Sequence, residues 1–397
     1  MDDLLERVRA LPCGRRLLEA AARADGVHLT GGGVRDLLLG REPRELDVVV
    51  EGDVTALATR LGDVDALHER FGTATVRAGD CRWDLAAARS ETYARAGALP
   101  DVRGAGIEQD LLRRDVTVNA FALDLRTGAL RAVEHAHEDL EAGCLRVLHD
   151  ASFLDDPTRL WRIARYVARL GFELEQGTAR LAAQAIAAGA LETVSGARIG
   201  NELRLALGEP DPPAALEVAV GLGLAPWLVP DRRRTAVALG LLPPGEGRAD
   251  LVVLGASLDE AADATDAVLA ELEFTAAERE VLRACRQAGP LAAAAAAAMS
   301  AARRPSKLAR VLRGVPVEAV AIAGADGATA AVRRWLYELR SVRLAITGDD
   351  LIAAGVPEGP EIGHRLEATL DRRLDGELEP GRDAQLSAAL QATPPGR

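Results

Sequence analysis

At 397 residues the chain is too long for one hydrophobic core, and we expect two to four domains. Apolar residues make up 48% of it and charged residues 27%, which excludes a largely disordered protein. The formal net charge of -12 excludes a basic coat for nucleic acid over the whole surface, but not a local basic face. The basic residues are nearly all arginine, and Lys307 is the only lysine in the sequence. A lysine-dependent phosphate loop of the GxxxxGK[ST] type is therefore excluded.

The beginning of the chain, MDDLLERVRALP, predicts an acidic amphipathic helix and not a signal peptide. No apolar stretch approaches about 20 residues without a charge, so we expect no membrane segment and a cytoplasmic protein. The four cysteines are widely scattered, without the spacing of a zinc site or a redox motif. We therefore predict that all four are reduced, namely Cys13, Cys81, Cys144 and Cys285.

Between Gly26 and about Leu148, short apolar runs alternate with helical stretches, which indicates an α/β or α+β half. The expected strands are VHLT, LDVVV, ATVRA, CRWDLAAA and VNAFALDL. From Ser152 onward strands nearly vanish and amphipathic helical patterns take over. The stretches EPDPP at Glu209 and LLPPGEG around Pro243 mark predicted boundaries within this helical part.

A glycine-rich turn, TGGGVRDLLLG, runs from Thr30 to Gly40 after the first expected strand. It opens a helix, so backbone N–H groups at that helix start could bind an anion. The alternative is a plain tight turn between a strand and a helix. The turn does not match the dinucleotide-binding pattern GxGxxG, because the sixth position is Asp36.

Two carboxylates, Glu45 and Asp47, stand at the start of the next expected strand. Side chains two residues apart on a strand project from the same face, so this pair could hold a divalent cation. A polar strand edge is the structural alternative. Asp84 adds a carboxylate on another expected strand, and DLLRRDVTVNAFAL adds Arg113, Arg114, Asp115 and Asn119. Carboxylates for Mg²⁺ and guanidinium groups for a triphosphate are what metal-dependent phosphoryl transfer requires.

The chain resembles the poly(A) polymerase and CCA-adding tRNA nucleotidyltransferase family of the bacterial and eukaryotic class. The resemblance spans about Gly26 to Leu207 and rests on GGGVRDLLLGREPRELDVVVEG, DLAAARSETYARAGALPDV, DLLRRDVTVNAFA, EDLEAGCLRVLHDASFLDDPTRLWRIARYVARLGF and VSGARIGNEL. A weaker match, ITGDDLIAAGVPEGPEIGHRL, is similar to the helical tail of bacterial members.

The resemblance implies an α/β nucleotidyltransferase head domain, with a small mixed β-sheet and helices, followed by all-α neck, body and tail domains. We expect the catalytic head at 1–148 and a nucleotide-selecting neck at 149–210. The body is expected at 211–340 and a tRNA-binding tail at 341–397.

The resemblance also implies catalytic roles. Gly32 and Arg35 would face the triphosphate. Glu45 and Asp47 would be the metal ligands, with Mg²⁺ as the expected cofactor, and Asp84 would be the assisting catalytic carboxylate.

The remaining candidates would bind the nucleotide. Contacts to ribose and phosphate are implied for Arg113, Arg114, Asp115 and Asn119. In DDPTRLWRIAR, Asp156 and Arg159 would read the incoming base, while Arg162 and Arg165 would continue the same helical face toward phosphate. From the residues alone, Asp156 before Pro157 is also a good helix N-cap, and the arginines could be a solvated helix face.

Three positions depart from the family pattern. The family usually has Asp in place of Glu45, usually has Glu in place of Asp155, and often has Glu in place of Ala197. The first position touches catalysis, but a glutamate carboxylate still binds Mg²⁺. The other two concern local packing.

The implied function is a template-independent CCA-adding tRNA nucleotidyltransferase, which adds CMP and AMP from CTP and ATP to the tRNA 3′ end by two-metal phosphoryl transfer. A poly(A) polymerase, or a partial enzyme that adds only CC or only A, shares the same residues. A non-catalytic tRNA-binding protein is the less favoured alternative. The residues leave the oligomeric state open.

Two features favour tRNA and full CCA addition. The part after Ser341 is acidic overall and not an arginine-rich arm for any RNA. The span between Asp84 and Arg113 is long enough for the mobile loop that full CCA addition needs in this family. We expect that loop in SETYARAGALPDVRGAG, Ser90 to Gly106.

Overall fold

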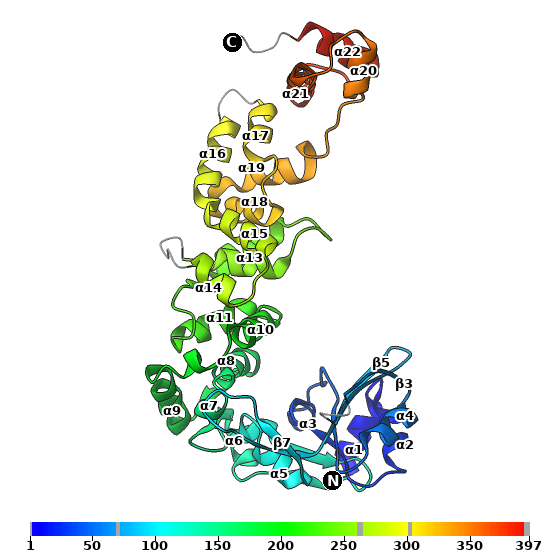
Figure 1. The fold of residues 1–397 in the computed structure, drawn as a ribbon, viewed down its shortest axis with the longest axis vertical. Helices are drawn as coiled ribbons and strands as arrows, with labels where there is room; N and C mark the ends of the chain where they lie inside the picture. The colour runs from blue at the N-terminus through cyan, green and yellow to red at the C-terminus, as the bar shows by residue number, and fades with distance from the viewer. Residues whose placement is uncertain (1, 69–71, 260–264, 301–303, 393–397) are drawn as a thin grey trace. The chain divides into compact units, whose positions relative to one another are not determined.

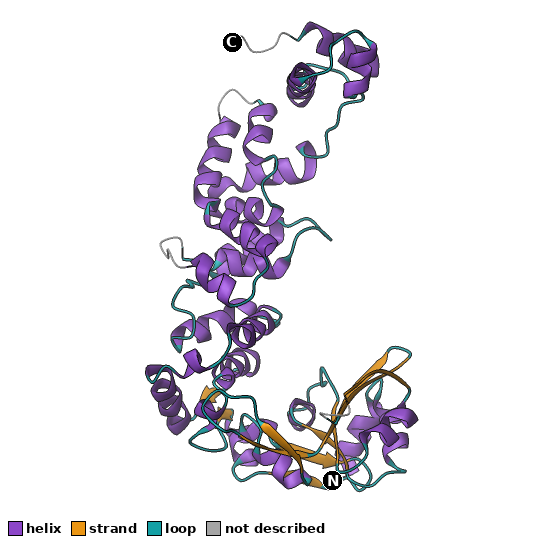
Figure 2. Ribbon diagram, viewed as in Figure 1, coloured by secondary structure: helices purple, strands orange, loops and turns teal. Residues whose placement is uncertain are grey.

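The structure, a computed structural model, describes residues 2–68, 72–259, 265–300 and 304–392. It divides into two compact units, which we describe separately. The first unit comprises residues 1–211 and 218–224, and the second comprises 212–217 and 225–397. Figure 2 shows that the strands belong to the N-terminal part of the chain and that helices make up most of the remainder.

A mixed β-sheet forms the centre of the first unit, with strand order β3-β4-β5-β2-β1-β8-β9. Strands β2 and β5 pair in parallel, and the other neighbours are antiparallel. The expected small mixed sheet is therefore confirmed. The strands are β1 Val27–Thr30, β2 Asp47–Val50, β3 Asp63–His68, β4 Thr73–Ala78, β5 Cys81–Ala87, β8 Phe121–Asp124 and β9 Leu130–Ala132.

Helices pack against this sheet, and Figure 1 shows α1, α2 and α4 beside the β3–β5 end. The VHLT strand is buried along its whole length, and the three valines that follow Asp47 are buried too. The helices of this part are α1 Asp2–Ala10, α2 Gly14–Ala21, α3 Gly32–Leu38, α4 Val54–Leu61, α5 Ile107–Leu112 and α6 Ala136–Ala142, with a 3₁₀ turn at Thr117–Asn119.

A helical segment completes the first unit and carries the DDPTRLWRIAR motif. Its longest helix, α8, buries Leu160, Trp161 and Ile163, and ends at Gly171 in the left-handed conformation. The elements are α7 Ser152–Asp155, α8 Thr158–Leu170, α9 Gln176–Ala187, a 3₁₀ turn at Ala190–Thr193 and α10 Gly196–Leu207. The next helix, α11 Pro212–Gly221, has residues in both units. Two small sheets flank them, β6 Arg89–Thr92 with β7 Asp101–Gly104, and β10 Cys144–Leu145 with β11 Glu173–Leu174.

The second unit consists of helices and turns in its described residues. The alanine run forms α16 as expected, because alanine has the highest helix propensity and its small side chain allows close packing. Ile346, Leu351, Val356 and Ala389 form a separate small core. The elements are α12 Arg232–Leu241, α13 Ala249–Ala256, α14 Thr265–Glu271, α15 Ala276–Arg286, α16 Ala288–Ser300, α17 Pro305–Leu312, α18 Val317–Ala323, α19 Thr329–Arg334, α20 Gly348–Ala353, α21 Pro360–Leu374 and α22 Arg382–Gln391, with π-helical turns at Gly324–Ala328 and Trp335–Leu339.

The expectation that every cysteine is reduced is wrong for one pair. Cys13 and Cys81 form a disulfide, with Cα atoms 5.5 Å apart. Cys13 lies between α1 and α2, and Cys81 begins β5, so the pair is brought together by the packing of the N-terminal helices near the sheet. A separation of 68 residues gives no sequence signal for this pairing. Cys144 and Cys285 are free.

In the described ranges, none of the helices combines the length and the apolar character needed to span a bilayer.

Candidate active site

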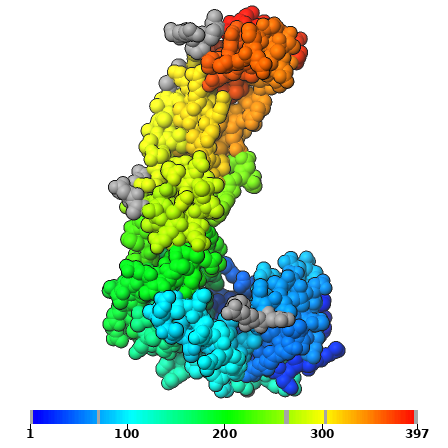
Figure 3. Space-filling view, viewed as in Figure 1, coloured from blue at the N-terminus to red at the C-terminus, as the bar shows by residue number. Residues whose placement is uncertain are grey.

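One cleft in the first unit brings together every site residue that the sequence analysis named. Its volume is ≈ 900 Å³, and Figure 3 shows a hollow between the blue and the green residues of this unit. Strands β2 and β5, the start of α3, the segment after α5 and helix α8 provide its walls. The predicted residues that line it are Gly32, Arg35, Glu45, Asp47, Asp84, Arg113, Arg114, Asp115, Asn119, Asp156, Arg159, Arg162 and Arg165.

The carboxylates meet because strands β2 and β5 are parallel neighbours. Asp47 is the register partner of Asp84, and Glu45 stands two residues before Asp47. Thr75 donates from Oγ1 to Asp84 Oδ1 at 2.7 Å and so orients this carboxylate. The predicted same-face acidic pair therefore lies beside a second strand that carries a carboxylate of its own.

Electrostatics make this position suitable for a cation. Asp47 is exposed at the start of β2, yet the cleft atoms around it reduce its hydration. This partial desolvation raises the pKa of Asp47, and the negative charge of Glu45 raises it further. Asp84 raises this pKa further, while Arg114 and Arg162 lower it. A divalent ion would relieve the repulsion that remains.

Within the described residues, no three His, Cys, Asp or Glu side chains are gathered as a ready metal site. Glu45 and Asp47 nevertheless suit a hard cation such as Mg²⁺, which proteins usually bind through one or two carboxylates together with water and substrate phosphates. The donor set therefore fits such an ion without a full protein cage.

The glycine-rich turn lets an arginine lie against the backbone. Gly31 precedes α3 with φ of 67°, in the region that glycine adopts without strain. A Cβ at this position would lie 2.8 Å from Arg114 Nη1. The glycine run thus allows close approach of a guanidinium group to the start of α3.

A buried carboxylate, Asp110, holds both predicted arginines of the motif that follows α5. It accepts hydrogen bonds from Arg113 Nε at 2.9 Å and from Arg114 Nη2 at 3.0 Å. Arg113 also donates from Nη1 to Glu91 at 3.0 Å. Asp110 was not among the predicted residues, although its spacing of three and four residues from the arginines is the usual signal for ion pairs on a helix.

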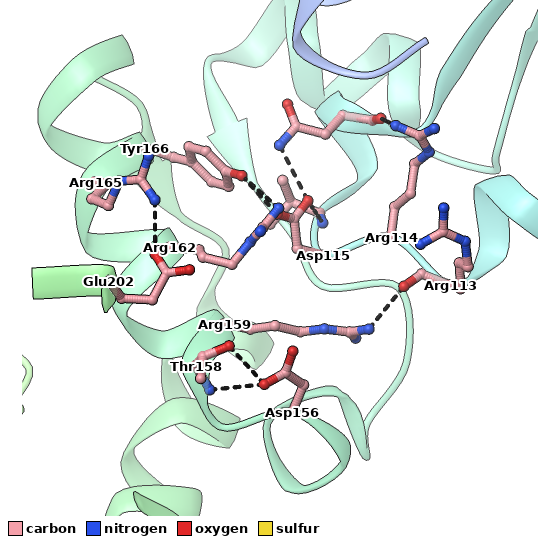
Figure 4. A network of polar contacts seen from close by, with 12 residues as sticks. Arg113, Arg114, Asp115, Asp156, Thr158, Arg159, Arg162, Arg165, Tyr166 and Glu202 are labelled. Atoms are coloured by element: carbon pink, nitrogen blue, oxygen red, sulfur yellow. Dashed lines mark hydrogen bonds and ion pairs between the residues drawn. The ribbon is translucent and has the colours of Figure 1, made fainter. Parts of the chain in front are cut away.

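Asp115 is the centre of a buried polar network (Figure 4). Arg162 donates to its Oδ2 from Nε and Nη2 at 2.8 and 2.6 Å, and Tyr166 donates to the same oxygen at 2.7 Å. Asn119 donates to Oδ1 at 3.1 Å and accepts from Arg35 Nη1 at 2.6 Å. Protein groups therefore occupy both oxygens of Asp115, so it orients residues that face the cleft.

The charge of Arg162 decides the protonation state of this buried acid. Burial by itself would raise the pKa of Asp115. The positive charge of Arg162, together with hydrogen bonds from Tyr166, Arg162 and Asn119, outweighs that effect and holds the pKa well below its usual range. Asp115 is thus a fixed anion.

Arg165 is also paired inside the protein. It donates from Nη1 to Glu202 at 2.7 Å and from Nε to Glu209 at 3.0 Å. Glu209, which is buried, accepts from Arg169 Nε at 2.8 Å as well. Neither glutamate was predicted, since each is reached only through packing of α10 against α8.

Asp156 makes cap-like contacts that leave one oxygen available. Thr158 donates to Oδ1 from its backbone N at 3.1 Å and from Oγ1 at 2.7 Å, and Arg198 Nη2 adds a contact at 2.8 Å. Among the described residues no hydrogen bond reaches Oδ2. Figure 4 shows this second oxygen directed away from Thr158. Asp156 therefore stabilises the start of α8 while keeping an acceptor for a ligand.

Arg159 lies beside Asp156 and is held by two contacts. Its Nη1 donates to Ser152 Oγ at 2.7 Å, and its Nη2 donates to the backbone oxygen of Arg113 at 2.8 Å. A guanidinium group has five N–H donors, so further donors remain for a ligand. The side chain is buried yet lines the cleft, which excludes the alternative of a solvated stripe for this arginine.

Comparison with known proteins agrees with this geometry. The family model described as the poly(A) polymerase head domain matches residues 27–146. A CC-adding tRNA nucleotidyltransferase of Deinococcus radiodurans is 34% identical, and the alignment covers 92% of this chain and 90% of that protein. The chain belongs to the tRNA nucleotidyltransferase family. Members of this family generally use divalent metal ions.

Other relatives differ in length and in the nucleotide they are named for. An A-adding tRNA nucleotidyltransferase of Geobacter sulfurreducens is 34% identical over 92% of this chain but over only 45% of its own length. The chain thus spans less than half of that relative. A solved structure of a CCA-adding enzyme in its apo form superposes with a TM-score of 0.82 at 27% identity, covering 98% of each chain. The predicted family and fold are confirmed.

The raised pKa of Asp47 predicts that this carboxylate slightly destabilises the metal-free protein, because water reaches the exposed side chain and weakens the effect. A carboxylate whose pKa is higher when folded lowers stability at neutral pH, and this effect disappears as the pH falls through the folded pKa toward 3.8. We expect Asp47→Asn to raise Tm at pH 7 in the presence of a chelator, with the difference shrinking toward pH 4. Added Mg²⁺ should then raise the Tm of the wild type and not that of the variant, as calorimetry can measure.

A matched control is Asp63→Asn, which removes an exposed carboxylate at the start of β3. It should leave both Tm and the response to Mg²⁺ unchanged. A lower Tm for Asp47→Asn at pH 7, or an equal response of both variants to Mg²⁺, would contradict the assignment.

Proposed function

We propose that the protein is a template-independent CCA-adding tRNA nucleotidyltransferase, which transfers CMP and AMP from CTP and ATP to the 3′ end of tRNA. The observation that supports this best is the single cleft that joins a carboxylate pair, several arginines and the Asp156–Arg159 pair. The names of its relatives support the substrate class. The sequence-based expectation of a cytoplasmic location suits a tRNA substrate.

Glu45 and Asp47 would hold Mg²⁺, which supplies activation of the tRNA 3′-hydroxyl and stabilisation of the leaving pyrophosphate. Asp84 assists from the neighbouring strand, where Thr75 fixes its orientation. Arg113 and Arg114 bring positive charge to the triphosphate while Asp110 holds them in place. The protein thus contributes position and charge to the reaction.

The adjacent Asp156 and Arg159 would select the base. Cytosine and adenine each present an amine donor beside a ring-nitrogen acceptor, whereas uracil and guanine present a carbonyl acceptor beside a ring N–H donor. The Asp156 carboxylate can accept from the amine, and the Arg159 guanidinium can donate to the ring nitrogen. Side chains would therefore replace a nucleic-acid template.

A partial enzyme that adds only A or only CC is the second candidate. The Geobacter sulfurreducens relative is named for A addition and the Deinococcus radiodurans relative for CC addition, and each aligns with 92% of this chain. The residues of the cleft do not separate these activities from full CCA addition, since all of them require the same chemistry.

The activity is tested by incubating the purified protein with Mg²⁺, each labelled nucleotide, and tRNA transcripts that end before the CCA sequence, after its second C, or after its terminal A. We expect C addition to the first transcript, A addition to the second, and none to the third. Addition of A to the second transcript alone would identify an A-adding enzyme. Extension of the third would indicate a poly(A) polymerase.

In the same assay Asp47→Ala should abolish incorporation, because a single remaining ligand cannot support two cations about 3.5–4 Å apart. Glu45→Asp, which keeps the charge, should retain activity. Undiminished turnover of Asp47→Ala at saturating Mg²⁺ would rule out the metal assignment.

Base choice is tested with Asp156→Ala and Arg159→Ala. We expect each variant to incorporate UTP and GTP and to use CTP and ATP more slowly, because matched polar pairs discriminate between bases by roughly 1–3 kcal/mol each. Single-nucleotide incorporation rates measure the preference directly. If both variants keep the wild-type preference, Asp156 is only a helix cap.

A further inference from the structure

The disulfide between Cys13 and Cys81 joins the N-terminal helices to the strand that carries Asp84. Cys13 directly precedes α2, and Cys81 is the first residue of β5, three residues before Asp84. Cys81 pairs with Ala78 at the turn of the β4–β5 hairpin. The covalent bond therefore fixes the end of this hairpin to the turn between α1 and α2.

The turn between α1 and α2 is itself held in place. A Cβ at Gly14 would lie 1.6 Å from a backbone oxygen of α1, so only glycine fits this close approach. Arg7 Nη1 donates to the Leu37 carbonyl of α3 at 2.6 Å, and Arg16 Nε donates to the Leu61 carbonyl of α4 at 2.6 Å. The disulfide thus ties β5 to a support that also holds α3, whose start lines the cleft.

A second pocket, with a volume of ≈ 360 Å³, connects this turn with the carboxylates of the cleft. Cys13 lines it together with Glu45 and Asp84, and both carboxylates line the cleft as well. Glu45 lies in an irregular segment before β2, so packing and not strand pairing determines its position. Movement of the turn that carries Cys13 would therefore act on both carboxylates.

The disulfide is accessible to a reductant, whereas the two free cysteines exchange poorly. Cys13 and Cys81 are both half-buried, and Cys13 lines the second pocket. The N-terminus of α2, which Cys13 caps, favours the thiolate that reduction releases. Burial raises the pKa of Cys285 to about 12, and it also raises the pKa of Cys144. A change of redox conditions therefore acts mainly at the Cys13–Cys81 pair.

The proposed tRNA substrate is a cytosolic molecule, and a stable disulfide is uncommon in the cytosol. Glutathione and thioredoxin keep cytosolic thiols reduced, so the disulfides found there are usually transient and either catalytic or redox-sensing. Among the described residues that line the cleft, neither Cys13 nor Cys81 occurs. A redox-sensing role therefore fits this pair better than a catalytic one.

We propose that the Cys13–Cys81 disulfide is a redox switch, which in its oxidised form holds β5 and the α1–α2 turn so that the neighbouring carboxylates bind a divalent cation tightly. The inference rests on the proposed function, because that function assigns the cation to Glu45 and Asp47. Reduction separates the hairpin end from the turn. Glu45 and Asp84 then lose a fixed mutual position, and the cation is bound more weakly.

The switch operates by thiol–disulfide exchange with a dithiol. One thiolate of the reductant attacks the Cys81 sulfur, which forms a mixed disulfide and releases Cys13 as a thiolate that takes up a proton. The second thiol of the reductant then closes the reductant's own disulfide and releases Cys81. Two electrons and two protons thus pass to the protein. Exchange with a small disulfide such as oxidised glutathione reverses the reaction.

The test compares the oxidised and the reduced form of the same chain. Titration calorimetry measures Mg²⁺ binding with and without dithiothreitol, and scanning calorimetry gives Tm. We expect reduction to weaken Mg²⁺ binding roughly tenfold, the lower end of the effect of disturbing groups that orient metal ligands. Tm of the metal-free protein should fall by roughly 5–15 °C, because reduction frees the unfolded chain from a cross-link. An equal Mg²⁺ affinity in both forms would overturn the switch even where Tm falls.

Two variants and a thiol count complete the experiment. The double variant Cys13→Ser, Cys81→Ser should bind Mg²⁺ as the reduced wild type does and should not respond to dithiothreitol. Cys144→Ser, which removes a free half-buried cysteine, is the matched control and should respond as the wild type does. Alkylation and mass spectrometry should show Cys13 and Cys81 blocked in the oxidised form. Persistence of both thiols in oxidised glutathione would also overturn the proposal.

Failure of this inference is distinguishable from failure of the proposed function. If the oxidised protein adds nucleotides to tRNA and reduction leaves its Mg²⁺ affinity unchanged, the switch is overturned and the function stands. If neither form adds nucleotides but reduction weakens Mg²⁺ binding, nucleotide addition fails and redox control of the cation site stands.

Discussion

The ion pair between Asp115 and Arg162 is the contact on which the arginine-lined wall of the cleft depends. Burial of a carboxylate is unfavourable unless partners satisfy it, and here Arg162, Tyr166 and Asn119 do so. Removing one member of a fully buried pair costs about 3–5 kcal/mol in typical proteins. The cost of removing Arg162 should be lower, because Asp115 is buried but the Arg162 side chain is 40% exposed. The pair also joins the segment after α5 to helix α8. It therefore holds together the two cleft walls that this segment and α8 provide.

Carboxylates of the protein hold other arginines around the cleft in the same way. Asp110 holds Arg113 and Arg114, and Glu209 holds Arg165 and Arg169. Each guanidinium group is therefore in place before a ligand arrives, which reduces the entropy lost on binding. Pairing also lowers the positive charge that the triphosphate meets, and the carboxylates of Glu45 and Asp47 lower it further. A divalent ion bound at Glu45 and Asp47 would restore positive charge for the triphosphate.

The buried elements of the fold could be predicted from the sequence, and the polar ones could not. VHLT was predicted over its full length, and all four of its residues are buried, including the polar His28 and Thr30. Strand β3 was missed; it is short, lies at the sheet edge and leaves most of its side chains exposed, so it lacks the apolar run that marks a buried strand. The start of VNAFALDL forms a 3₁₀ turn before β8, since periodicity does not fix strand ends. The Cys13–Cys81 disulfide depends on tertiary packing alone.

The candidate site shows the same division. The predicted residues that line the cleft lie in motifs that can be recognised in the sequence. The carboxylates that hold the cleft arginines in place were missed. Asp110 had a usable signal in its helical spacing from Arg113. Glu202 and Glu209 lie about 40 residues from the arginines they hold and had none. Arg198 reaches Asp156 through the packing of α10 against α8, which no local pattern encodes.

The central claim is that buried carboxylates fix the arginines of the cleft before a nucleotide binds. A crystal structure of this protein with CTP or ATP and a divalent ion tests it most directly. The account predicts that the triphosphate lies in the cleft while the hydrogen bonds of Arg162 to Asp115 and of Arg114 to Asp110 persist. A complex in which either arginine leaves its carboxylate to bind phosphate would contradict it.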